Sequence, residues 1–194
     1  MIDWTQQWEL FAENFHDGKA HIDLTRFGGS SILRLLPGPG FGDLSHPTTY
    51  LMLQLMEGRV KDQSVLDIGC GSGILGLSAL QLGAKQVLGI DIDPEAIEHA
   101  KKNAELNGLQ ADFGLMVPEG YPGNQIVLMN MIMSEQTVVM EQKDRLNELA
   151  QIWITSGILV QQRDVYAQLT KSWGWKLKKE ARKGEWLGMV FEKM

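Results

Sequence analysis

Two short segments carry the residue types best suited to chemistry. The first follows Asp67, at the end of the apolar run 64–68, and its glycines fall at every second position: Gly69, Gly71 and Gly73. Glycine has no Cβ, so such a loop can turn sharply and bring its backbone close to a ligand. The second segment is the apolar run 86–90, which ends at Asp91. A carboxylate there can accept hydrogen bonds from both ribose hydroxyls, so the two segments predict a nucleoside-binding site.

The spacing of the glycines favours one cofactor over another. The pattern over 67–73 is Asp-x-Gly-x-Gly-x-Gly, which is shifted from the G-x-G-x-x-G loop that opens to a pyrophosphate. The 194 residues also contain no second mononucleotide-binding half. Both features favour S-adenosylmethionine over NAD, although an acidic residue after the second strand suits either cofactor. Asp93 precedes Pro94 and is expected to cap a helix.

The elements that must position these residues alternate between strand and helix patterns. Such alternation predicts an α/β fold, with a mostly parallel sheet and helices on both faces. The expected strands are 32–36, 64–68, 86–90, 112–117, 126–131 and 152–159. The expected helices are 3–15, 47–56, 74–82, 94–106, 136–150 and 162–173. A glycine- and proline-rich loop covers 37–46, with Ser45 as a plausible helix cap, and 175–180 with 186–192 predicts a C-terminal antiparallel hairpin.

Composition sets the class of protein. Hydrophobic residues make up 44% and charged residues 22%, and the net charge is -6, which together suit a soluble globular chain that acts in the cytoplasm. We expect no secretion signal and no membrane partner. The four histidines show no metal-ligand spacing, so no metal site is expected, and the single cysteine, Cys70, is interpreted as a small buried filler. The lysines and arginines at 176–183 are interpreted as a solvated edge.

Further motifs resemble one family. They are Phe41-Gly42 with His46–Thr49, the loops Val65–Leu75 and Gly89–Pro94, Gly83–Lys85 between them, Asn130–Ile132, Ser156–Leu159 and Glu185-Trp186. In these segments the sequence resembles the class I methyltransferases, and within them the PrmA type, which methylates large-subunit ribosomal protein eleven. The resemblance covers nearly the whole chain. It implies a Rossmann-like class I fold with a seven-stranded, mostly parallel sheet, and S-adenosylmethionine as cofactor.

The resemblance also implies site residues. Cofactor contacts are expected at six positions: Thr49, Asp67, Gly69, Gly71, Asp91 and Asn130. Simpler interpretations remain open for three of them, since Thr49 could be a hydrogen-bonding residue early in a helix, Asn130 a polar strand end, and Asp67 a residue that orients the glycine loop. The sequence indicates no catalytic residue, and His46 is interpreted as a turn residue and not as a base. The methionines at 129, 131 and 133 are interpreted as packing residues on one strand face.

The family implies an enzyme that N-methylates a protein acceptor, either a lysine of a ribosomal protein or an N-terminal amine. Alternatives are a small-molecule methyltransferase, an RNA methyltransferase and a non-catalytic S-adenosylmethionine-binding module. Nucleic acid is the less favoured acceptor, because Asn130 is followed by Met-Ile-Met and not by the Pro-Pro-aromatic run of many base methyltransferases. Asp43 and Leu44 replace a Thr and a Gly of the family's loop and would block the entrance in a binding module.

We expect one structural domain. Residues 1–46 would form a helix, a strand and an entrance loop packed on the core, and 47–194 the cofactor-binding methyltransferase domain. The family's separate N-terminal domain, which recognises the substrate, has no counterpart in these residues. The cofactor site is therefore better supported than the family's acceptor.

Overall fold

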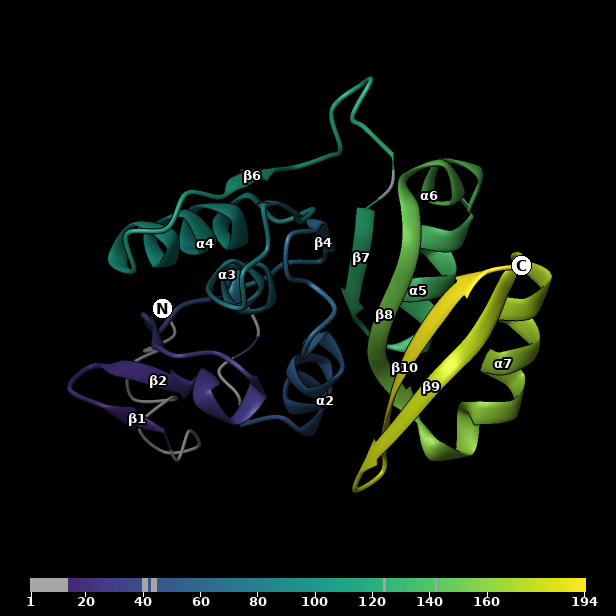
Figure 1. Ribbon diagram of the computed structural model, residues 1–194, viewed down its shortest axis with the longest axis horizontal. Coiled ribbons are helices and arrows are strands. Elements are labelled where there is room, and N and C mark those ends of the chain that lie inside the picture. Colours follow the sequence, from purple (N-terminus) through teal and green to yellow (C-terminus); the bar gives the residue numbers. More distant parts are fainter. Residues whose placement is uncertain (1–13, 40–41, 43–44, 124, 142) are drawn as a thin grey trace.

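The structure is a computed structural model, which describes residues 14–39, 42, 45–123, 125–141 and 143–194 (Figure 1). Its centre is a seven-stranded sheet in the order β6-β5-β4-β7-β8-β10-β9. The strands are β4 (Ser64–Ile68), β5 (Gln86–Ile90), β6 (Asp112–Gly114), β7 (Gln125–Asn130), β8 (Ala150–Leu159), β9 (Trp175–Lys183) and β10 (Trp186–Lys193). The first five pair in parallel, and β10 runs antiparallel to both β8 and β9. This arrangement confirms the predicted mostly parallel sheet and its C-terminal hairpin.

The strand order reverses beside β4, which lies between β5 and β7. Chain connections leave β4 in opposite directions at such a switch point, and a crevice opens at the carboxyl ends of the strands. The glycine loop follows β4, Asp91 follows β5, and Asn130 ends β7. The topology therefore gathers these residues at one edge of the sheet.

Helices cover both faces of the sheet because its strands are apolar on both sides (Figure 1). Along β7, Ile126 and Leu128 join one buried cluster, whereas Val127 and Met129 join the other. The first cluster includes side chains of α2 (Pro47–Met56), α3 (Ile74–Gln81) and α4 (Pro94–Leu106). The second includes side chains of α5 (Met133–Met140), α6 (Lys143–Leu149) and α7 (Arg163–Ser172). No helix among the described residues is both long and apolar enough to cross a membrane.

A small antiparallel sheet precedes α2. It contains β1 (Phe15–His16), β2 (Lys19–Asp23) and β3 (Ile32–Leu35), with the 3-10 helix η1 (Leu24–Phe27) between β2 and β3. The predicted helix over 3–15 is wrong at its end, because Phe15 pairs with Ala20 as a strand; residues 3–13 lie outside the described residues. The predicted strand over 32–36 is confirmed as β3, one residue shorter.

Several predicted boundaries need correction. The helix expected over 136–150 is two helices, α5 and α6, and Ala150 already belongs to β8. The strand expected over 126–131 ends at Asn130, so Met131 and Met133 do not continue the strand face of Met129. The strand expected over 112–117 ends at Gly114. Before α7, a short 3-10 helix, η2 (Val160–Gln162), occupies the start of the predicted helix.

The helix that begins at Pro47 is confirmed, but its cap is not Ser45. His46 occupies the N-cap, and its Nδ1 accepts a hydrogen bond from the backbone N–H of Thr48 at 3.3 Å. Pro47 has no N–H to satisfy in the first turn, which suits that position. The cap fixes how α2 starts, and α2 then packs on β8, β9 and β10.

Candidate functional site

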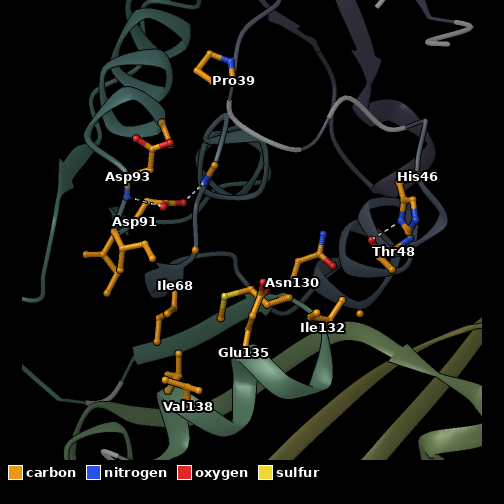
Figure 2. Close-up of a pocket in the computed structure, with 18 of the residues that line it drawn as sticks. Pro39, His46, Thr48, Ile68, Asp91, Asp93, Asn130, Ile132, Glu135 and Val138 are labelled. Carbon is orange, nitrogen blue, oxygen red and sulfur yellow. Dashed lines mark hydrogen bonds between the residues drawn. The ribbon is translucent and has the colours of Figure 1, made fainter. Parts of the chain in front are cut away.

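A cavity of about 690 Å³ opens at the carboxyl ends of β4, β5 and β7 (Figure 2). This volume falls within the range of small-molecule and cofactor sites. Its walls come from the glycine loop, the segment after β5, the end of β7, the starts of α2 and α5, and the hairpin. The lining residues are Pro39, His46, Thr48, Ile68, Gly69, Gly71, Ile90, Asp91, Ile92, Asp93, Ala96, Leu115, Asn130, Met131, Ile132, Glu135, Val138, Val139, Gly157 and Trp186.

The glycine loop owes its path to backbone conformations that favour glycine. Gly69 has φ +71° and Gly71 has φ +54°. A Cβ on Gly69 would lie 2.7 Å from Met131 Sδ. The N–H groups of Gly69 and Cys70 donate to the carbonyl of Ile90 at 2.8 and 3.0 Å, which ties the loop to the end of β5. The loop is thus fixed by its own backbone, with Gly69 and Gly71 facing the cavity.

Asp67 lies behind the loop and does not line the cavity. Only 1% of its surface is exposed, and its Oδ2 accepts a hydrogen bond from the N–H of Gly76 in the first turn of α3 at 3.0 Å. Burial raises the pKa of Asp67 to about 7, against the lowering effect of the Gly76 hydrogen bond; the nearby Asp91 raises it further. This geometry agrees with the interpretation that Asp67 orients the loop.

Asp91 and Asp93 have different places in the segment after β5. Asp91 lines the cavity, and its carboxylate accepts from the N–H of Gly71 and the N–H of Asp93, both at 3.0 Å. Asp93 Oδ1 accepts from the N–H of Glu95 at 2.8 Å and caps α4, as predicted. Figure 2 shows both carboxylates at one end of the cavity, with dashed lines for the two Asp91 hydrogen bonds, of which the one from Gly71 joins the two loops.

Asn130 and the start of α2 form the other wall. Asn130 lines the cavity, whereas Thr49 is completely buried and its neighbour Thr48 lines the cavity instead. Successive residues of a helix point about 100° apart, so a one-residue difference decides which threonine faces the site. Of the six predicted contact positions, the structure places Gly69, Gly71, Asp91 and Asn130 around one cavity, and Asp67 and Thr49 behind its wall.

A buried polar network holds the floor of the cavity. Gln136 Nε2 donates to the carbonyls of Met131 at 2.6 Å and Ser156 at 2.8 Å, and its Oε1 accepts from the hydroxyls of Thr155 and Tyr166. The carbonyl of Met131 also packs against Gly157, where a Cβ would lie only 2.0 Å away. A satisfied buried network of this kind fixes one backbone arrangement. The connection from β7 into α5 is therefore rigidly placed.

Sequence reasoning missed several lining residues. Ile92 and Leu115 are apolar yet 94% and 53% exposed, and they flank the end of the cavity at Asp91. An isoleucine between two loop aspartates was a usable signal for Ile92. Glu135 had no such signal, because the helix was expected to begin at residue 136 and α5 begins at Met133. Trp186 also lines the cavity, with its ring 5.1 Å from that of His46.

Cys70 and His46 both have structural roles, and His46 also lines the cavity. Cys70 is 4% exposed, and burial raises the pKa of its thiol, which agrees with its interpretation as a filler. His46, interpreted as a turn residue, caps α2. Within the part of the chain that the structure describes, no three His, Cys, Asp or Glu residues gather in a way that could hold a metal ion.

Comparisons with known proteins agree with this fold. The model of the family described as ribosomal protein L11 methyltransferase (PrmA) matches residues 18–194. A ribosomal protein L11 methyltransferase of Geobacter metallireducens is 36% identical over 166 residues, which are 84% of this chain and 55% of that protein. A relative of the same name from Dictyoglomus turgidum is 31% identical and is matched over 97% of this chain and 66% of its own length. The chain thus spans about half to two thirds of these curated relatives.

Solved structures extend the comparison. The ribosomal protein L11 methylase of Lactobacillus delbrueckii subsp. bulgaricus superposes with a TM-score of 0.75 at 28% identity, over 89% of this chain and 98% of that one. The putative RNA methyltransferase of Pyrococcus horikoshii, with a TM-score of 0.64 at 17% identity over 79% of this chain and 86% of that one, shares the fold. With the match of the family model over nearly the whole sequence, the chain belongs to the PrmA family of ribosomal protein L11 methyltransferases.

Proposed function

We propose that this protein is an S-adenosylmethionine-dependent methyltransferase that N-methylates an amine of a protein acceptor. The observation that carries the proposal is the convergence of Gly69, Gly71, Asp91 and Asn130 around one cavity in a chain of the PrmA family. Because this chain spans only about half the length of the Geobacter metallireducens relative, the activity of that relative is proposed for this chain and not assumed.

The residues of the cavity fit the parts of the cofactor. Asp91 retains lone pairs for the two ribose hydroxyls beyond its two loop hydrogen bonds. The exposed apolar side chains of Ile92 and Leu115 suit the faces of the adenine ring. Gly69 and Gly71 leave room for the amino-acid part, and Asn130 would lie near the reactive methyl group. Asp67 and Thr49 would act indirectly, by holding the walls.

When bound, S-adenosylmethionine supplies a sulfonium methyl group that is intrinsically activated for in-line displacement. The protein's own task is then to align the acceptor and exclude water, which can account for much of the rate. An amine must be neutral to attack, and a free lysine has a pKa of about 10.4, so the acceptor loses a proton first. Asn130, in the wall of the cavity, is the group best placed to orient that nitrogen.

A protein acceptor suits the charge of the cavity better than a nucleic acid. Its described lining contains three carboxylates, those of Asp91, Asp93 and Glu135, and no lysine or arginine. Binding to a phosphate backbone relies on lysine and arginine contacts. The names of the relatives point to ribosomal protein L11. We therefore propose that the acceptor is a ribosomal protein and that the reaction takes place in the cytoplasm.

The proposal is tested by binding and transfer measured separately. Calorimetry with S-adenosylhomocysteine should give a micromolar dissociation constant. Methyl-labelled cofactor is then supplied with purified ribosomal protein L11 of Geobacter metallireducens, or with RNA, and label should enter the protein. Label found only in RNA would reject the proposed acceptor, and lack of cofactor binding would reject the enzyme.

Asn130→Ala tests the proposed role of that residue. We expect turnover to fall by roughly 100-fold, as for other losses of substrate positioning. Asn147→Ala is the matched control, because the Asn147 amide donates to the Trp173 carbonyl at 3.2 Å and does not line the cavity. Unchanged turnover and unchanged cofactor affinity in Asn130→Ala would remove the residue from the mechanism.

A further inference from the structure

The acidic residues of the cavity are not equivalent. Asp91 accepts hydrogen bonds from the Gly71 and Asp93 backbones, and Asp93 accepts from the Glu95 backbone. The side-chain carboxylate of Glu135 has no hydrogen bond or ion pair with any part of the chain that the structure describes. It is therefore the lining carboxylate with its full capacity left for a ligand.

The backbone of Glu135 is held in a defined place, and its side chain is exposed. It lies in the first turn of α5, where the helix dipole favours a negative charge. The next residue, Gln136, is fully buried and fastens this turn to the Met131 and Ser156 carbonyls. Figure 2 shows the Glu135 side chain pointing into the cavity beside Asn130, at a distance from the Asp91 end.

The surroundings of Glu135 are apolar. Ile132 and Val138 lie three residues before and three residues after Glu135, and both line the cavity. They are 50% and 63% exposed, so they present hydrocarbon surface to a ligand. A lysine side chain has the complementary form, with an apolar stem of four methylenes and a cationic head. A carboxylate beside apolar surface would therefore bind a lysine side chain more tightly than a neutral side chain of equal length.

We propose that Glu135 determines specificity for an amine acceptor by receiving the ammonium head of a lysine side chain, with Ile132 and Val138 against its stem. This inference rests on the proposed methyltransferase function and extends it by naming the residue that selects the acceptor. Glu135 binds the protonated amine as it arrives. The proton passes to solvent water before transfer, which leaves the lone pair on nitrogen for attack, and Glu135 is not assigned as the base.

The test uses two probes with the same stem. The full chain is saturated with S-adenosylhomocysteine, and butylammonium or 1-butanol is titrated in while the methyl signal of Met131, which lines the cavity, is followed by carbon-13 methionine NMR. In the native protein, butylammonium should bind about three- to fivefold more tightly than 1-butanol, the range expected for a partly exposed ion pair. Glu135→Gln and Glu135→Ala should abolish this preference.

The matched control is Glu141→Gln. Glu141 is exposed at the C-cap of the same helix and does not line the cavity, so this variant removes one negative charge without touching the site. It should keep the native preference for butylammonium, and equal loss in both variants would show a general charge effect and overturn the inference.

Cofactor binding separates the two proposals. The affinity for S-adenosylhomocysteine should change less than twofold in Glu135→Gln, and a larger loss would assign Glu135 to the cofactor and overturn the inference. Cofactor binding in a protein that shows no amine preference overturns the role of Glu135 alone. Failure of the native protein to bind any cofactor overturns the proposed function and this inference together.

Discussion

Asp67 is a carboxylate in an unfavourable place. It is buried under the glycine loop, and its Oδ1 has no hydrogen-bond partner while Oδ2 accepts from Gly76. Burial disfavours the charged form, which is why the pKa of Asp67 rises from 3.8 to about 7. The folded protein therefore retains a proton on Asp67 that the unfolded chain has already lost in mildly acidic solution.

This difference predicts how stability depends on pH. Between about pH 4 and pH 7 the folded state binds one more proton than the unfolded state, so the Asp67 contribution to the free energy of unfolding falls as pH rises, by up to about 1.4 kcal/mol per pH unit. Below this window both states are protonated and the contribution is complete. Asp67→Asn cannot titrate and should not show this fall.

Urea unfolding of the native protein and of Asp67→Asn across this window measures the effect. Subtracting the two curves removes the contribution of groups such as His99, whose pKa burial lowers and whose effect on stability has the opposite sign. A difference that stays constant with pH would mean that Asp67 is ionised in the folded state.

Gly157 allows β8 to lie close to the connection between β7 and α5. It lies in β8 with φ +94°, and a Cβ there would meet the Met131 carbonyl at 2.0 Å. Gly174, after α7, has the same φ of +94° but nothing within 4 Å of a Cβ. The two glycines thus share their backbone conformation and differ in their surroundings.

Alanine substitutions should separate these contributions. Gly174→Ala should cost about 1 kcal/mol from backbone strain alone. Gly157→Ala should cost about 3 kcal/mol or more, because the β7–α5 connection must also move, and cofactor affinity should fall with it. Denaturant unfolding and calorimetry measure both quantities, and equal costs in the two variants would contradict a close approach at Gly157.

The elements differ in how far the sequence predicts them. The strands β4, β5 and β7 and the helices at Pro47 and Pro94 were predicted, because buried runs, prolines and caps are local signals. The small sheet of β1 and β2 was missed, since strands of two and five residues are set by pairing and packing and not by periodicity. The break between α5 and α6 falls within one continuous helical pattern.

The same distinction holds for the candidate site. The loops after β4 and β5 were predicted because their glycines and Asp91 have a fixed relation to strand ends. Thr49 was expected to face the cofactor, but the phase of a helix at its first turn depends on the cap, and the structure turns Thr48 to the cavity. Glu135 depends on the start of α5, which the sequence placed at residue 136, three residues late.

Cofactor binding should stabilise the whole molecule. A ligand that binds only the folded state adds about 2.7 kcal/mol at 100 times its dissociation constant. For a chain of 194 residues this corresponds to a rise in Tm of roughly 5–10 °C. Thermal unfolding with S-adenosylhomocysteine should show this rise, Asp91→Ala should lose most of it, and a comparable rise with NAD would instead favour a nicotinamide site.

The sheet ends at β9, which pairs on one side with β10. Of its six exposed residues one is Glu180, and the other five are cationic: Lys176, Lys178, Lys179, Arg182 and Lys183. An open strand edge can template pairing with another chain, and closely spaced lysines oppose this by mutual repulsion between two such edges. The basic run, which does not line the cavity, is therefore expected to oppose edge-to-edge pairing of two copies of this chain, and its repulsion should weaken as salt screens the charges.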